Sequence, residues 1–226
     1  LPAFVDAARL LNIRGCSITI PHKIDIIPLL DKTSENVREM GACNTLYCDG
    51  EKICGENTDV IGFTAPLRKR SLPPETRVLV LGAGGVSRAA IAGLRRLGLA
   101  NITLTNRRKE RAEALCNEFG LLCAPWEERG DVPADLIINT TPLGMTGAQE
   151  HETPYPRAFQ DNGIAYDLIY TPFQTRFLRD AAAAGWETVS GLDMFIGQGD
   201  AQFHLWTGHH LPEEAITAVT SALYGQ

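Results

Sequence analysis

The 226-residue chain has little of several features that mark other classes of protein. Its six cysteines are scattered; none forms a Cys-x-x-Cys pair and no His/Cys group has zinc spacing, which argues against a disulfide framework and a zinc site. No apolar run approaches the roughly 20 residues that span a bilayer. No basic run accompanies the net charge of -6. We therefore expect a cytoplasmic protein with reduced thiols, no metal, and neither nucleic acid nor membrane as partner.

The first 70 residues mix short helices with short strands. Apolar spacing predicts helices at 2–12, 24–30 and 33–40, and strands at 15–20, 44–48 and 52–55. Asp49-Gly50, between the last two strands, indicates a two-residue hairpin turn. A further helix is expected at 60–69, with Asp59 as its N-cap.

Beyond a proline-containing linker at 71–75, strands and helices alternate. Strands are predicted at 77–81, 101–105, 121–123, 135–139, 164–168 and 187–189, and helices at 86–97, 108–119, 192–206 and 213–224. Such alternation is typical of a parallel sheet covered by helices on both faces. The expected fold class is therefore α/β.

A glycine-rich turn follows the first strand of this second region. The segment Gly82-Ala83-Gly84-Gly85-Val86-Ser87 stands between that strand and a helix. Gly82 permits the tight turn, Gly84 lets the backbone approach a pyrophosphate, and the small Ser87 lets the helix pack closely on the sheet. Helix N-terminal N–H groups then face the phosphates. The segment predicts a dinucleotide site, with an ordinary glycine turn as the alternative.

The next strand ends in basic residues instead of an acid. Asn106 lies 22 residues after Gly84 (106 − 84) and is followed by Arg107 and Arg108, with Arg111 close behind. An acid here binds the ribose of NAD, whereas arginine accommodates the 2′-phosphate of NADP. Guanidinium groups bind a phosphate bidentately and would lack a partner on a bare ribose. We predict NADP, with a solvated basic turn as the alternative.

Three polar clusters lie at expected loops or element ends of the first region. They are Thr19-Ile-Pro-His-Lys23, Gly41-Ala-Cys-Asn-Thr45 and Gly55-Glu-Asn-Thr-Asp59. Taken singly, each has an ordinary explanation: a solvated Lys23, a turn-forming Asn44, a helix-capping Asp59.

Taken together, and with motifs further along, these clusters resemble the shikimate dehydrogenase family over almost the whole chain. The motifs that carry the resemblance are Gly15-Cys-Ser-Ile-Thr-Ile-Pro-His-Lys23, Gly41-Ala-Cys-Asn-Thr-Leu46, Gly55-Glu-Asn-Thr-Asp59, Gly82-Ala-Gly-Gly85, Asn106-Arg-Arg108, Ile138-Asn-Thr-Thr-Pro-Leu-Gly-Met145, Tyr166-Asp-Leu-Ile-Tyr170, and Gly191-Leu-Asp-Met194 with Gln198. Because they occur in the family's order, the set is far more specific than any one motif.

The resemblance implies two domains with the active site in the cleft between them. An N-terminal α/β substrate domain would comprise 1–70 and 192–226, with C-terminal helices returning to it, and a Rossmann-type NADP-binding domain would comprise 71–191. The implied reaction is the NADP-dependent, reversible reduction of 3-dehydroshikimate to shikimate, a step of aromatic amino-acid and chorismate biosynthesis. The implied assembly is a monomer or homodimer.

The resemblance also implies roles for individual residues. Lys23 and Asp59 would be the catalytic acid–base pair. Substrate contacts would come from Thr19, Asn44, Asp59, Tyr170 and Gln198. Cofactor contacts would come from Gly82, Ala83, Gly84, Gly85, Val86, Ser87, Asn106, Arg107, Arg108, Arg111, Thr140, Leu168, Gly191 and Met194, with Met145 as a further candidate.

The chemistry of these side chains agrees with the implied reaction. Negative charge develops on a ketone oxygen as hydride reaches its carbon, and a lysine ammonium stabilises that charge and delivers the proton. Asp59 would hold Lys23 in place. Met194 and Gln198 are four residues apart, so one helix face can present both to nicotinamide and substrate. Core packing by Met194 is the alternative.

One family feature is expected to be missing. The family has an N-terminal strand–helix segment with a Ser-x-Ser motif that binds the substrate carboxylate, and this sequence begins within the family's next helix. Its loss would weaken substrate binding and remove a strand from the first sheet.

Three other functions stay open: a quinate/shikimate dehydrogenase that uses NAD, the dehydrogenase half of a fusion with a dehydroquinate dehydratase, and a non-catalytic NADP-binding module.

Overall fold

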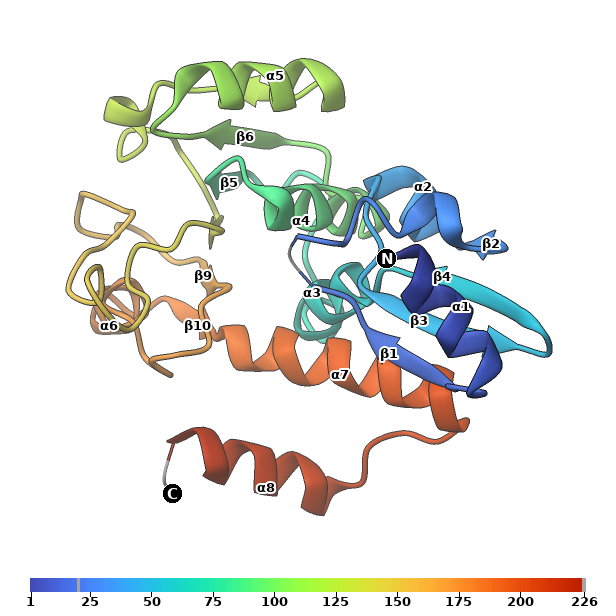
Figure 1. Cartoon of the computed structure of the whole chain (residues 1–226). Coiled ribbons are helices and arrows are strands. Elements are labelled where there is room, and N and C mark those ends of the chain that lie inside the picture. The colour runs from blue at the N-terminus through green and yellow to red at the C-terminus, as the bar shows by residue number, and fades with distance from the viewer. Residues whose placement is uncertain (20, 225–226) are drawn as a thin grey trace.

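The computed structural model describes residues 1–19 and 21–224. Two β-sheets flank a central group of helices, α3 (Thr58–Arg68), α4 (Gly85–Arg96) and α7 (Gly191–Thr207) (Figure 1). Strands from the first quarter of the chain build the small sheet, and strands between residues 78 and 189 build the large one. Within the described residues, no helix is long and apolar enough to cross a membrane.

The small sheet has the order β1-β3-β4-β2. Its strands are β1 (Gly15–Ser17), β2 (Lys32–Thr33), β3 (Thr45–Asp49) and β4 (Lys52–Glu56). The predicted hairpin is present, but Asp49 still pairs with Lys52, so the two-residue loop is Gly50-Glu51, one residue later than expected. Gly50 adopts φ +63, a left-handed conformation that favours glycine.

Two predicted helices of this region are wrong in extent. Residues 24–30 form turns and the short 3-10 helix η1 (Ile27–Leu29), because Pro28 lacks the N–H that a longer α-helix needs. The helix expected at 33–40 starts later, since Thr33 is paired in β2, and α2 (Glu35–Met40) is capped by Ser34.

The N-terminal helix α1 (Pro2–Leu10) covers the small sheet. Its Val5 and Ala8 pack in one buried cluster with Leu46 of β3 and Ile53 of β4. β1 is shorter than the predicted strand at 15–20, and Ile20 of that prediction lies outside the described residues.

The large sheet is wholly parallel and has the order β10-β9-β8-β5-β6-β7. Its strands are β5 (Val78–Leu81), β6 (Ile102–Thr105), β7 (Leu122–Cys123), β8 (Leu136–Asn139), β9 (Ile164–Asp167) and β10 (Glu187–Val189). The chain runs outward from β5 to β7, then returns to the other side of β5 at β8. Ligands of such sheets bind outside the carboxyl ends of the strands, where this direction reverses.

Both faces of the large sheet are buried, as predicted. Val78 and Val80 pack toward α3, α4 and α5 (Lys109–Phe119), whereas Leu79 and Leu81 pack toward α6 (Arg176–Ala183). Because successive side chains of a strand point to opposite faces, a strand covered on both sides is apolar throughout. The α/β fold class inferred from the alternation is confirmed.

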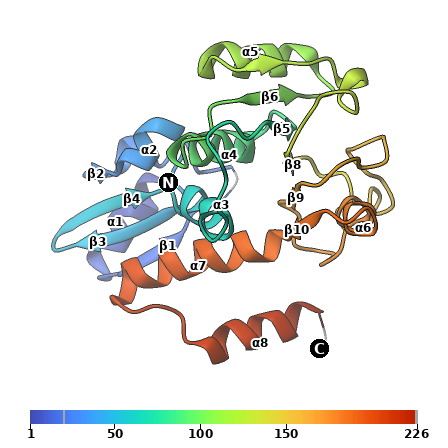
Figure 2. The same cartoon turned by 180° about the vertical axis from the view of Figure 1, so that it is seen from behind.

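Helix α7 connects the two sheets. It begins directly after β10, runs beside α3 and ends against β3 (Figure 2). There Trp206 Nε1 donates to Leu46 O at 2.9 Å. Gly62 of α3 makes the close packing possible, since a Cβ there would lie 2.5 Å from Met194 O. The last helix, α8 (Glu213–Tyr224), runs back along α7, and its Tyr224 ring lies 5.1 Å from that of Phe173.

Candidate active site

The glycine turn after β5 leaves open space in front of it and is supported from behind. Gly82 has φ +115, and a Cβ there would lie 2.4 Å from Thr140 Oγ1, whereas a Cβ on Gly84 or Gly85 would meet nothing within 4 Å. Ser87 is fully buried; its Oγ accepts from Gly84 N at 3.0 Å and lies 2.7 Å from Thr140 Oγ1. The structure therefore places Ser87 behind the turn, where it shapes the loop.

A first hollow, of about 220 Å³, lies between this turn and the end of β6. It is lined by Gly82, Ala83, Gly84, Asn106, Arg107, Arg108, Arg111, Trp126, Thr140, Thr141, Pro142, Leu143 and Gln149. Asn106 ties the two strand ends together, because its Oδ1 accepts from Ala83 N at 3.3 Å and its Nδ2 donates to Arg108 O at 2.9 Å.

Within the described residues the three arginines at this hollow form no ion pair with an acidic side chain, whereas other arginines, among them Arg70, Arg77 and Arg88, do. Unpaired guanidinium groups beside a helix N-terminus are suited to an anionic ligand, and a phosphate suits them best. The open glycines and the unpaired arginines fit a dinucleotide with an additional phosphate.

A second hollow, of about 700 Å³, opens beside the first. It is lined by Thr19, Asp59, Val86, Thr140, Thr141, Pro142, Met145, Thr146, Leu168, Ile169, Tyr170, Thr171, Gly191, Met194, Phe195 and Gln198. Four residues predicted to bind substrate and five predicted to bind cofactor thus share one cleft. Residues 140–142 line both hollows, so one elongated ligand can occupy the two together.

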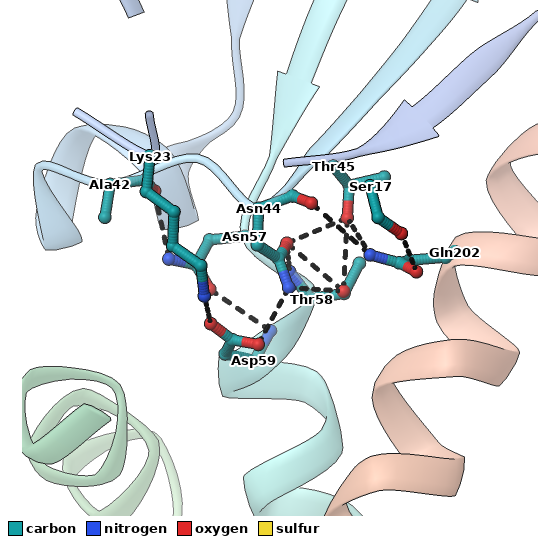
Figure 3. A network of polar contacts seen from close by, with 9 residues as sticks. All are labelled: Ser17, Lys23, Ala42, Asn44, Thr45, Asn57, Thr58, Asp59 and Gln202. Atoms are coloured by element: carbon teal, nitrogen blue, oxygen red, sulfur yellow. Dashed lines mark hydrogen bonds and ion pairs between the residues drawn. The ribbon is translucent and has the colours of Figure 1, made fainter. Parts of the chain in front are cut away.

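Asp59 lines this cleft and forms an ion pair with Lys23, which is not itself among the lining residues (Figure 3). Lys23 Nζ lies 2.7 Å from Asp59 Oδ2, and the two side chains are 29% and 16% exposed. The prediction that Asp59 is the N-cap of its helix is wrong; the cap is Asn57, whose Oδ1 accepts from Asp59 N at 3.1 Å. The place of Asp59 in the first turn frees its carboxylate for the cleft, and the positive end of the helix dipole stabilises its charge.

Asn44 supports Asp59 from the buried side. Its Nδ2 donates to Asp59 Oδ1 at 2.8 Å, and its Oδ1 accepts from Thr58 N at 2.8 Å and from Thr45 Oγ1 at 2.8 Å. Only 3% of Asn44 is exposed and it does not line the cleft, so the structure brings it to the catalytic pair as a support. Its contact with substrate stays a prediction.

Helix α7 contributes the far wall of the cleft. Gly191 fits there because a Cβ would lie 2.5 Å from Ile169 O, and Met194 both lines the cleft and packs in the large-sheet core. Tyr170 stacks on Phe195 with ring centroids 5.0 Å apart. Gln198 Nε2 donates to Phe195 O at 3.1 Å, which directs this side chain along the helix toward the cleft wall.

Two residues with structural or binding roles were not identified from the sequence. Gln202 is buried on α7, accepts from Ser17 Oγ at 2.8 Å and donates to Thr45 Oγ1 at 3.0 Å, which locks α7 to the small sheet (Figure 3). Trp126 lines the first hollow, with the Arg129 guanidinium 4.0 Å from its ring centroid. A signal for Trp126 existed, because it follows β7, and the carboxyl ends of parallel strands share one binding edge.

This geometry defines a class of protein. Its sheet is parallel with this strand order, and a glycine turn opens the helix after the first strand. Arginines without an ion pair stand at the next strand end, and an ammonium–carboxylate pair belongs to the adjoining cleft. Together these are features of a nucleotide-dependent oxidoreductase.

Comparison with known proteins is more specific. Three family models match: the shikimate dehydrogenase substrate binding domain over residues 1–46, shikimate / quinate 5-dehydrogenase over 67–128, and the shikimate 5'-dehydrogenase C-terminal domain over 191–219.

Whole-chain relatives agree. The shikimate dehydrogenase (NADP(+)) of Pelobacter propionicus is 55% identical over 99% of this chain and 82% of that protein. The shikimate 5-dehydrogenase of Thermus thermophilus, solved in complex with NADP(H) and shikimate, is 36% identical, with a TM-score of 0.85 over 99% of this chain and 84% of that one. Quinate dehydrogenase of Corynebacterium glutamicum, in complex with NAD, is 31% identical, with a TM-score of 0.85 over 99% and 83%. The chain belongs to the shikimate dehydrogenase family.

Proposed function

We propose that the chain catalyses the NADP-dependent, reversible reduction of 3-dehydroshikimate to shikimate, within aromatic amino-acid and chorismate biosynthesis. The observation that carries the proposal is the Lys23–Asp59 pair, 2.7 Å apart, at the edge of a cleft that shares residues 140–142 with the arginine-lined hollow. One end of that arrangement suits a phosphorylated dinucleotide and the other suits a polar ketone. The family's shikimate dehydrogenases named for NADP(+) support the same reaction.

NADPH supplies the hydride when it is bound. The protein's own part is to meet the charge that then develops on the ketone oxygen. The Lys23 ammonium is placed to stabilise this alkoxide and to donate a proton to it. Asp59 holds Lys23 through its Oδ2 and is itself held by Asn44 through its Oδ1, so both members of the pair are positioned before the substrate arrives.

Substrate hydroxyls and carboxylate need several donors and acceptors around the catalytic pair. Thr19, Tyr170 and Gln198 line the cleft with Asp59 and provide them, and Asn44 completes the proposed set at the inner end. On the cofactor side, Arg107, Arg108 and Arg111 would bind the 2′-phosphate, the turn at 82–87 the pyrophosphate, and Leu168, Gly191 and Met194 the nicotinamide.

We infer the corresponding division of the chain: a substrate domain of residues 1–70 and 192–226, and a nucleotide domain of 71–191. The two sheets support this division, since β1 to β4 form one sheet and β5 to β10 form the other.

We also propose a cytoplasmic location, supported by six cysteines that are all free.

The test is a steady-state assay of purified protein with NADPH and 3-dehydroshikimate, and with NADP and shikimate in reverse. Turnover in both directions is expected; no turnover with either pair would overturn the proposal.

A second candidate is a quinate dehydrogenase that uses NAD, favoured by the likeness to the quinate dehydrogenase of Corynebacterium glutamicum. A larger kcat/KM for quinate with NAD than for shikimate with NADP would decide for it.

A further inference from the structure

Two neighbouring strands of the large sheet end in polar side chains that are fully buried. Asn139 ends β8, Asp167 ends β9, and the two are paired in the parallel register. Asn139 Nδ2 donates to Asp167 Oδ1 at 2.9 Å. Burying an amide and a carboxyl is costly unless both are well hydrogen-bonded, so their other partners indicate what the pair does.

Asn139 holds the loop that follows β8. Its Oδ1 accepts from Thr141 N at 2.9 Å and from Thr141 Oγ1 at 2.7 Å, and its Nδ2 also donates to Leu143 O at 3.2 Å. Because a backbone N–H can only donate, the contact with Thr141 N determines which amide atom is the oxygen. The loop held in this way contains residues 140–142, the wall common to both hollows.

Asp167 holds the loop that follows β9. Its Oδ1 also accepts from Ile169 N at 3.0 Å, and its Oδ2 accepts from Thr175 Oγ1 at 2.6 Å. Leu168, Ile169 and Tyr170 of this loop line the main cleft. Ile169 O in turn accepts at 3.2 Å from the backbone N of Gly191, the first residue of α7. One carboxyl group thus orders the loop and the start of the helix opposite Asp59.

The contacts of Asp167 suit a geometric role. Burial raises its pKa to about 7, although its hydrogen bonds to Thr175, Ile169 and Asn139 lower it; in the described part of the chain no ionisable side chain contributes. A proton on Oδ2 can be donated to the Thr175 hydroxyl, while Oδ1 keeps its two donors. Both protonation states therefore preserve the bonds to Asn139 and Ile169.

We propose that Asn139 and Asp167 are positioning residues: bonded to each other across the strand ends, they hold the 140–143 and 168–170 loops at the separation that the nicotinamide end of NADP and the substrate require. The inference rests on the proposed dehydrogenase function and extends it to two residues that line neither hollow. They act on the reaction only through Thr141, Ile169 and the residues beside them.

Asn139→Asp gives the sharpest test, because it preserves shape and replaces the donor by a second carboxyl. Two adjacent buried carboxylates can hydrogen-bond only after one binds a proton. Because the neighbouring charge raises the pKa of the pair above the value of about 7 that Asp167 has in the parent protein, the shared proton leaves only in alkaline solution. We expect kcat/KM for NADPH, relative to the parent protein, to fall about 10- to 100-fold near pH 10, the cost of a small misplacement of reacting groups. The deficit should shrink by at least about fivefold near pH 7, where the shared proton keeps the bond. An equal deficit at both pH values would contradict the proposal.

Asp167→Asn is the conservative variant. Its Oδ1 can accept from Asn139 and Ile169, and its amide can donate to Thr175, so kcat/KM should stay within about threefold of the parent value. Asp167→Ala removes every acceptor and should behave like Asn139→Asp near pH 10, without recovery near pH 7. Ile137→Ala is the matched control: it creates a cavity in the same strand, away from both hollows, and should lower stability with the KM for NADPH unchanged.

A readout on the ligand-free protein separates this inference from the proposed reaction. Hydrogen exchange at the Ile169 amide, which loses its acceptor, and at the Thr141 amide should be faster in Asp167→Ala than in the parent protein near pH 7, and the Kd for NADPH from protein fluorescence should rise with it. If the parent protein is active but Asp167→Ala keeps slow exchange at both amides and the parent Kd, the positioning role is overturned and the proposed function is not. An inactive parent protein overturns the proposed function instead.

Discussion

Lys23 Nζ and Asp59 Oδ2 lie 2.7 Å apart although 36 positions separate the two residues in the chain. Lys23 comes from the loop after β1, and Asp59 from the first turn of α3. The same carboxylate accepts from Asn44 through its other oxygen, so each side chain of the group limits the freedom of the next. This arrangement supports the first prediction.

Lys23→Ala should lower kcat for 3-dehydroshikimate reduction about 100- to 10,000-fold, the range of a lost general acid. The KM for NADPH should change little, because Lys23 pairs with Asp59 and does not line the arginine-lined hollow. Steady-state kinetics at saturating NADPH measure the effect. Lys32→Ala is the matched control, since Lys32 forms an exposed ion pair with Asp49 at 3.1 Å; its kcat should equal the parent value. Near-normal turnover of Lys23→Ala would remove the assignment.

Arg107→Ala should weaken NADPH binding and leave NADH binding nearly unchanged. Loss of a charge-assisted contact to a phosphate is expected to raise the KM for NADPH about 10-fold. The ratio of kcat/KM values for the two cofactors is the measurement that matters. Arg157→Ala, at an exposed ion pair with Asp131, serves as the control and should keep the parent ratio. An unchanged NADPH KM in Arg107→Ala would mean that the phosphate binds elsewhere.

Trp126→Ala should weaken NADPH and NADH binding to a similar degree. The indole lines the first hollow, and Arg129 covers part of it, so the ring offers a face to the adenine that both cofactors share. Base–aromatic stacking is worth about 1–3 kcal/mol, which corresponds to roughly a 5- to 150-fold rise in Kd. Titration followed by nucleotide fluorescence measures it, and Trp126→Phe should recover most of the affinity. Selective loss of NADPH alone would contradict a role at the adenine.

Asp167→Asn should stabilise the protein at high pH. The folded-state pKa of Asp167 is raised to about 7, above the usual 3.8. Folding therefore takes up a proton between these values, and the parent protein loses stability as pH rises from about 4 to about 7. The upper limit of the loss is about 4 kcal/mol, from three pKa units at about 1.4 kcal/mol each.

Urea unfolding of the parent protein and of Asp167→Asn, each near pH 5 and near pH 8, tests the direction of this pH dependence of stability. The free energy of unfolding of the variant, relative to the parent value, should be larger near pH 8 than near pH 5. A difference that is constant with pH would show that Asp167 does not titrate in this range. Ile137→Ala, which removes no ionisable group, should give such a constant difference and serves as the control.

Local patterns predicted most of the nucleotide-binding half. The apolar runs at Val78–Leu81 and Ile102–Thr105, the glycines between them and the arginines after them are all close in sequence, and each reflects a rule about one strand, turn or helix end. The small sheet was predicted less well. Pro28 ended a helix early, and Thr33 was drawn into β2 by pairing with Gly55, which lies 22 positions away.

By itself the sequence determined the fold class, the cofactor class and, through its motifs, the family. Tertiary structure decided which of the named side chains line a hollow and which support those that do. Asn44 is buried and hydrogen-bonds to Asp59, and Ser87 is buried behind the glycine turn, next to Thr140. The strand order, in contrast, brings Trp126 to the cofactor hollow. The physical reason is that periodicity and turn chemistry act within a few residues. The Lys23–Asp59 and Asn139–Asp167 bonds, in contrast, depend on packing that joins distant segments, and burial at that packing raises the pKa of Asp167.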